Sequence, residues 1–218
     1  MTHEPVQPGT KSASGVGSPK RVETLTDGVF AIVMTLIVLQ IAVSNGPARE
    51  LGDDLRALIP TILAYALTFI TLGTLWFGNR TQSEFIRRAD HPMVWLTLLM
   101  LLIVALVPFS AALLGRYPTT PIAVVTYGVQ LTLVFAVHGC IWLYATLHPA
   151  LMRDDISERY RRLSRLAAFM PAIGYAIATG LGALSPIVGL IGYLVVPIPF
   201  VTGLYYRGLD AIDRTAKS

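Results

Sequence analysis

The sequence predicts an all-α polytopic membrane protein with six transmembrane helices and both termini on the cytoplasmic side. The composition, the length of the apolar runs and the placement of basic residues carry this prediction. Hydrophobic residues make up 54% of the 218 residues and charged residues only 14%, whereas an average soluble domain carries about 25% charged residues. We therefore expect nearly the whole chain to lie in or against a bilayer.

Six apolar runs follow one another, separated by short loops. They cover about residues 22–43, 55–77, 92–114, 121–147, 163–184 and 186–206, and each is close to the ~20 residues that a spanning helix needs. Pro197 and Pro199 are expected to bend the sixth helix. Gly174, Ala178 and Gly182 on the fifth have the spacing of small residues that allows close helix packing.

These runs define one membrane domain, at residues 20–207. Residues 1–19 are rich in Gly, Ser, Thr and Pro and are expected to form a disordered tail. Residues 208–218 are expected to form a short cytoplasmic tail.

The basic residues give the orientation. Only Arg49, Arg56 and Arg116 lie on one side of the six runs, and the other fourteen of the 17 Lys and Arg residues lie on the opposite side. Positive charge marks the cytoplasmic side, so both termini are expected inside. A cleaved signal peptide ending near Ala42-Val43-Ser44 is an alternative for the first run, but Asp27 and the long polar lead disfavour it.

The sequence lacks the residues that several functional classes of protein require. None of the thirteen Asp and Glu residues lies near the middle of a predicted helix, although ion-coupled transporters usually need such carboxylates. The sequence has no HExxH, no GxxxxGK and no TVGYG segment. With Cys140 as the only cysteine, no cysteine-based metal site is possible. We expect no enzyme, no metal site, no cofactor and no nucleic-acid partner.

The first run carries the most specific pattern. Arg21 and Asp27 precede Gly28-Val29-Phe30-Ala31-Ile32 and Thr35-Leu36-Ile37-Val38-Leu39, and Trp76 and Val107-Pro108-Phe109 follow in later runs. With these residues the chain resembles the endosomal and lysosomal potassium channel family, transmembrane protein 175. Two departures are Leu25-Thr26 in place of Phe-Ser, and Asn79 where the family usually has His.

The resemblance implies a potassium-permeable cation channel without a carbonyl filter. Bacterial members of the family assemble as homotetramers, and the first helix of each subunit lines the pore. The implied location is the bacterial plasma membrane, the implied partners are further copies of the chain and the lipid bilayer, and the permeant ion is potassium. A small secondary transporter and a structural membrane protein without transport remain as alternatives.

By matching residues, the resemblance implies a hydrophobic constriction made of Ile32, Leu36 and Leu39, with Thr35 beside them. These positions are spaced i, i+3, i+4 and i+7, so they share one helix face. Such an apolar stripe is also typical of lipid-facing or packed helices. The Thr35 hydroxyl either adds a polar ring to the pore or bonds to a carbonyl of its own helix.

The resemblance also implies a polar network between helices, made of Arg21, Thr26, Asp27 and, in place of the family's His, Asn79. A capping box formed by Thr24 and Asp27 is an alternative explanation of Asp27. His138 is a possible additional polar site, because a histidine inside a membrane is a functional candidate. Its alternative is a neutral histidine that is hydrogen-bonded to a neighbouring helix.

Overall fold

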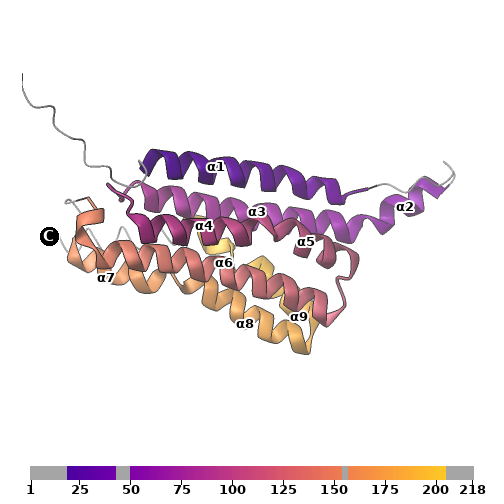
Figure 1. The fold of residues 1–218 in the computed structure, drawn as a ribbon. Coiled ribbons are helices and arrows are strands. Elements are labelled where there is room, and N and C mark those ends of the chain that lie inside the picture. The colour runs from indigo at the N-terminus through magenta and orange to yellow at the C-terminus, as the bar shows by residue number, and fades with distance from the viewer. Residues whose placement is uncertain (1–18, 43–49, 154–156, 205–218) are drawn as a thin grey trace, which may run out of the picture.

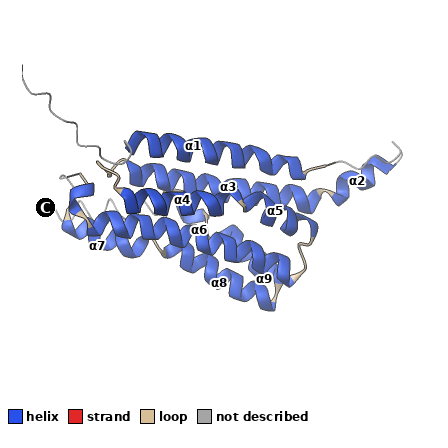
Figure 2. Ribbon diagram, in the orientation of Figure 1, coloured by secondary structure: helices blue, strands red, loops and turns tan. Residues whose placement is uncertain are grey.

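Every regular element in the described part of the chain is a helix (Figure 2). The structure is a computed structural model that describes residues 19–42, 50–153 and 157–204. The elements in chain order are α1 (Pro19–Leu36), the 3₁₀ helix η1 (Ile37–Gln40), α2 (Leu51–Ala57), α3 (Ile59–Ser83), α4 (His91–Ala105), α5 (Val107–Arg116), α6 (Pro121–Leu147), the 3₁₀ helix η3 (Pro149–Leu151), α7 (Glu158–Ala167), α8 (Met170–Leu184), α9 (Pro186–Val195) and α10 (Ile198–Val201). Apart from Pro19, the two expected tails lie outside the described residues.

Within the described residues, five helical segments are long and apolar enough to cross a membrane. They are Pro19–Gln40, Ile59–Ser83, His91–Arg116, Pro121–Leu147 and Glu158–Leu184, and a shorter apolar segment, Pro186–Val201, follows them. The chain is therefore an all-α polytopic membrane protein, and these segments are consistent with about six spans.

Three of the expected spans are interrupted beside a proline. The break between α4 and α5 falls at Leu106, two residues before Pro108, and the break between α7 and α8 ends two residues before Pro171. Proline lacks an amide hydrogen and clashes with the preceding turn, so it is accommodated in the first turn of a new helix. The runs expected at 92–114 and 163–184 are therefore each present as one apolar helical segment that is divided internally beside a proline. The bend expected at Pro197 and Pro199 is present, between α9 and α10.

The second span is displaced toward its C-terminal end. A separate short helix, α2, covers the residues where we expected this span to begin, and α3 then runs to Ser83, six residues beyond the expected end. The apolar run ends near Phe77, but the polar residues after it continue the helix. Asn79 and Gln82 consequently lie on the last turns of α3 and not in a loop.

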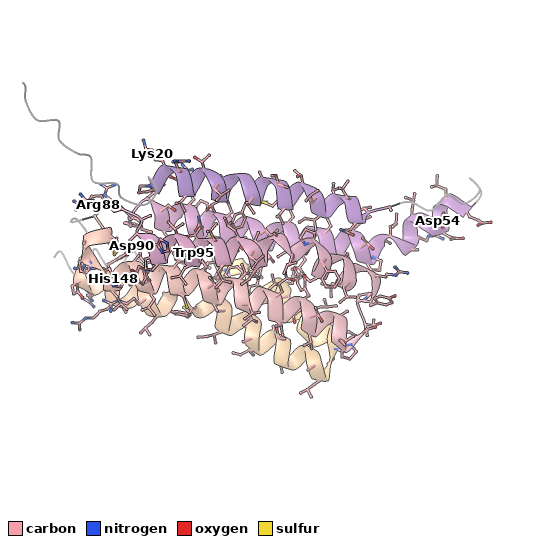
Figure 3. The ribbon with its side chains drawn as sticks, in the orientation of Figure 1. Lys20, Asp54, Arg88, Asp90, Trp95 and His148 are labelled. Carbon is pink, nitrogen blue, oxygen red and sulfur yellow. The ribbon has the colours of Figure 1, made fainter. Side chains whose placement is uncertain are left out.

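The helices lie roughly along one long axis, with α1 at one edge and α8 and α9 at the other (Figure 1). The long helix α6 lies between them and contacts α4 and α5 as well as α8. In contrast, α1 contacts mainly α3 and α4. Lys20, Arg88 and His148 lie at one end of the bundle and Asp54 at the other (Figure 3).

Close backbone contact joins α8 to α9. A Cβ atom built on Gly189 would lie 2.5 Å from the Cα of Gly182, and one built on Gly192 would lie 2.6 Å from the Cβ of Ala178. Gly174 similarly faces Val196. The expectation that Gly174, Ala178 and Gly182 allow close packing is confirmed, and their partner is the next helix in the chain.

Buried hydroxyl groups tie α3, α6, α8 and α9 together. The Tyr127 hydroxyl lies 3.1 Å from the Thr68 hydroxyl, and the Tyr193 hydroxyl donates to the carbonyl oxygen of Val124 at 3.0 Å. Both tyrosines are fully buried. A buried hydroxyl without a partner is costly in an apolar interior, so each of these bonds fixes how two helices lie against each other.

Candidate functional site

The first helix has two distinct faces. Phe30 and Val33 on α1 and Ile37 on η1 are buried against the rest of the bundle. The opposite face is exposed, and between Leu25 and Leu39 its large side chains are apolar. A helix with an apolar outer face that its own subunit leaves uncovered can face lipid, a second subunit or a pore.

All four residues expected at the pore lie on this uncovered face. Ile32 is 59% exposed, Leu36 43% and Leu39 70%, and Thr35 is exposed between them. Leu39 belongs to η1 and not to an α-helix, but residues three apart in a 3₁₀ helix eclipse each other. Leu36 and Leu39 are therefore still expected to lie on one line.

The Thr35 hydroxyl is bonded within its own helix. It donates to the carbonyl oxygens of Ile32 at 2.8 Å and Ala31 at 3.1 Å. This is the backbone-bonded alternative for Thr35. The oxygen keeps a free lone pair, so the group can still present an acceptor to the exposed face.

Asp27 is bonded to α3 through a residue that we did not expect in the network. Its carboxylate oxygen Oδ1 accepts a hydrogen bond from the indole Nε1 of Trp76 at 2.8 Å. In the sequence, Trp76 stands out only as one of the residues that carry the family resemblance. A signal for this pair was present, because a partly buried indole N–H needs an acceptor and a carboxylate inside an apolar run needs a donor.

The capping box is not formed. The described part of α1 begins at Pro19, so Thr24 lies within the helix and its hydroxyl donates to the carbonyl oxygen of Lys20 at 2.8 Å. Thr26 is buried and donates to the carbonyl oxygen of Val22 at 2.9 Å. The capping-box explanation of Asp27 is therefore wrong.

The other expected members of the network are brought together only in part. Thr26 and Asn79 line the same cavity, of about 360 Å³, between α1, α3 and α4. Asn79 lies one turn after Trp76 on α3. Arg21 is exposed, and in the described structure the Oδ1 atom of Asp27 is bonded to Trp76.

His138 lies apart from this cluster, on α6. It is buried, with 5% of its surface exposed, and its Nε2 atom has no hydrogen-bond partner in the described structure. Among the described residues, Nε2 of His138 therefore does not make the hydrogen bond to a neighbouring helix that the alternative explanation requires.

Comparisons with known proteins point to one family. Residues 21–108 match the family model described as endosomal/lysosomal potassium channel TMEM175. A protein named as a potassium channel from Streptomyces collinus is 29% identical over 171 residues, which are 76% of this chain and 82% of that protein. Another, from Chamaesiphon minutus, is 29% identical over 200 residues, which are 85% of this chain and 92% of that protein.

A solved structure has the same fold. It is the crystal structure of a lysosomal potassium-selective channel TMEM175 homolog from Chamaesiphon minutus, with a TM-score of 0.75 and 25% sequence identity. The match covers 84% of this chain and 96% of that one. The matched region therefore extends well beyond α1 and includes most of the bundle.

Proposed function

This chain belongs to the TMEM175 family, which is a family of channels and not of enzymes, and we propose that it forms a potassium-permeable cation channel. The names of its bacterial relatives and the length over which they match support potassium as the permeant ion. The single observation that carries the proposal is the apolar face of α1 and η1, with Ile32, Leu36 and Leu39, that the other described helices of the same subunit leave uncovered.

In the proposed pore these three side chains form successive hydrophobic rings. A cation that enters a narrow apolar ring loses water and gains no ligand in exchange. Potassium holds its water less tightly than sodium, so it meets the lower barrier. Selection of this kind needs no carbonyl filter, and its strength depends on the width of the ring.

A pore lined by one helix per subunit requires several copies of the chain. We propose a closed homotetramer around the α1 helices, because a closed ring leaves no apolar face unmatched. Both termini are proposed to lie on the cytoplasmic side of the bacterial plasma membrane. The placement of Lys20 and Arg88 at one end of the bundle supports this orientation (Figure 3).

At the cytoplasmic entrance of the proposed pore, we propose a polar network that joins neighbouring subunits. Its members are Arg21, Thr26, Asp27 and Asn79. The Asp27–Trp76 bond fixes α1 against α3 within one subunit, and the exposed guanidinium of Arg21 is then available to a neighbouring copy. Residues 20–207 are proposed to form the whole channel domain, with 1–19 and 208–218 as tails.

Potassium flux into liposomes tests the proposal. Purified protein is expected to pass potassium down its gradient without a coupled ion, and its mass in mild detergent is expected to be that of a tetramer. Flux that requires a second ion gradient would instead indicate a secondary transporter. No flux from correctly assembled protein would overturn the channel.

A further inference from the structure

A small, partly open cavity lies between helices of the subunit, away from α1. Its volume is about 50 Å³, and its walls come from α3, α6, α7, α8 and α10 and from the loop after α3. Aromatic rings of Phe85, Phe135 and Trp142 form part of the walls, and the lining includes no Asp, Glu, Lys or Arg. The cavity is therefore distinct from the proposed pore, and His138 is the one side chain among its described lining residues that contains an ionisable imidazole.

Two buried polar atoms in this lining lack partners. They are Nε2 of His138 on α6 and Oε1 of Gln82 on α3, and neither has a hydrogen-bond partner in the described structure. Native proteins leave very few buried polar atoms without a partner. An unmade bond costs the full desolvation penalty of the group, so two such atoms in one cavity indicate a bound molecule that satisfies both.

The size of the cavity limits that molecule. A cavity of about 10–15 Å³ is enough for one water molecule, and each water takes up about 30 Å³ in the liquid, so 50 Å³ has room for roughly one or two. Cavities that are truly empty are lined by apolar groups, and this one is not. An ion is disfavoured because no charged lining residue would offset its desolvation.

The chemistry of the lining suits water in particular. Gln82 Oε1 only accepts hydrogen bonds, while His138 Nε2 donates or accepts according to its tautomer. Water can donate to Gln82 and serve either form of His138. Thr74 and Thr81 also line the cavity, and because their hydroxyls already donate to helix carbonyl oxygens, their lone pairs remain to accept a third bond from the water.

We propose that this cavity is a structural water site, in which ordered water bridges His138 Nε2 to Gln82 Oε1 and so joins α6 to the end of α3. Gln82 also lines the 360 Å³ cavity between α1, α3 and α4 that contains Thr26 and Asn79. The side chain of Gln82 thus stands between the water site and the polar cluster at the entrance. The bridge holds this part of α3 in place from the side opposite α1.

A double-mutant cycle tests the bridge. His138→Leu and Gln82→Met each remove one end of the bridge and leave the other end unsatisfied, so each is expected to lower the Tm of the detergent-solubilised protein by about 3–8 °C. The double variant, whose cavity is apolar, is expected to lose clearly less than the sum of the two single losses. His138→Gln, which places an amide near the position of Nε2, is expected to lose less than His138→Leu.

A dry cavity predicts the opposite signs. Each single variant would then remove a costly unsatisfied atom and raise the Tm, and the two effects would add. A direct measurement guards against general misfolding of the variants: in protein with ¹⁵N-labelled histidine in lipid, solid-state NMR is expected to show a contact between His138 Nε2 and water that His138→Gln abolishes. The absence of this contact in the unmodified protein would overturn the water site.

Discussion

The pair of Asp27 and Trp76 shows how one residue can be identified while its partner is missed. A carboxylate that follows a basic flank and opens an apolar run was visible in the sequence, and Asp27 does reach α3. Which residue of α3 meets it depends on how α3 is rotated about its axis. The mostly apolar pattern of α3 does not define that rotation, because the helix has no single polar face.

Loss of the indole donor is expected to loosen α1. Trp76→Phe keeps an aromatic ring but leaves Oδ1 of Asp27 without its hydrogen bond, which costs about 1–2 kcal/mol at this partly exposed position. Asp27→Asn is expected to cost less, because the amide oxygen still accepts from the indole. Unfolding by denaturant in a single detergent measures the changes.

Thr24→Ala is the matched control for these two variants. The Thr24 hydroxyl bonds only to the backbone of its own helix and is exposed, so its loss is expected to change stability by less than about 0.5 kcal/mol. Equal shifts for Trp76→Phe and Thr24→Ala would mean that the Asp27–Trp76 bond contributes nothing to stability.

The buried hydroxyls lead to a second prediction at this scale. Tyr127→Phe removes the contact with Thr68 between α6 and α3, and the expected loss is about 0.5–1.5 kcal/mol, the range of such bonds between membrane helices. Tyr65→Phe is the control, because Tyr65 is only partly buried and its ring packs at a tilt against Phe69. The same unfolding measurement compares the two, and a larger loss for Tyr65→Phe would contradict the role of the bond.

At the scale of the elements, the sequence predicted the positions of the apolar spans but did not predict the points at which a span is divided into two helices. The run at 121–147 appears as the single helix α6, with the expected bounds. The runs containing Pro108 and Pro171 are each divided, because a proline in an apolar run leaves the hydropathy high while it breaks the hydrogen-bond ladder. Likewise, α3 outlasts its apolar run because polar residues continue a helix as readily as apolar ones.

The hairpin of α8 and α9 depends on the absence of a side chain. Gly189→Ala would place a methyl group 2.5 Å from the Cα and 3.2 Å from the N of Gly182, and because both are backbone atoms of a packed helix, neither can move aside. The helices must separate, at an expected cost of about 1–3 kcal/mol. Gly180→Ala, on the exposed face of α8 with open space around it, is expected to be neutral. Thermal unfolding in detergent would refute the close contact if both variants behaved alike.

At the scale of the whole molecule, the uncovered face of α1 acquires its proposed function only in the proposed assembly. The sequence could place Ile32, Leu36 and Leu39 together on a face, but a single chain supplies only one side of a pore. The face is apolar whether it meets lipid, protein or a permeating ion, so hydropathy cannot distinguish these environments. The resemblance to a channel family supplied that distinction, and the exposure of the three side chains agrees with it.

Shortening the side chains of the proposed hydrophobic rings is expected to lower the preference of the channel for potassium over sodium. Leu36→Ala and Leu39→Ala widen the constriction, so sodium loses less of its water there and the ratio of potassium to sodium permeability falls toward one. Planar-bilayer recordings measure the ratio and the conductance. Ile177→Ala, on the exposed face of α8, is the control and is expected to leave both unchanged. Unchanged permeation in both leucine variants would move the pore to another helix.

The polar tie between α1 and α3 has a mechanical consequence. The Asp27–Trp76 bond holds α1 near its middle, while between Asp27 and Leu39 the buried side chains of the described helix that hold it to the bundle, Phe30, Val33 and Ile37, are apolar. Apolar contacts have no preferred direction and allow sliding, whereas the hydrogen bond resists it. Asp27 therefore acts as a pivot, about which a small tilt of α1 becomes a larger sideways displacement at Leu39. In the proposed channel, the diameter of the pore then depends on this tilt as well as on the size of the side chains.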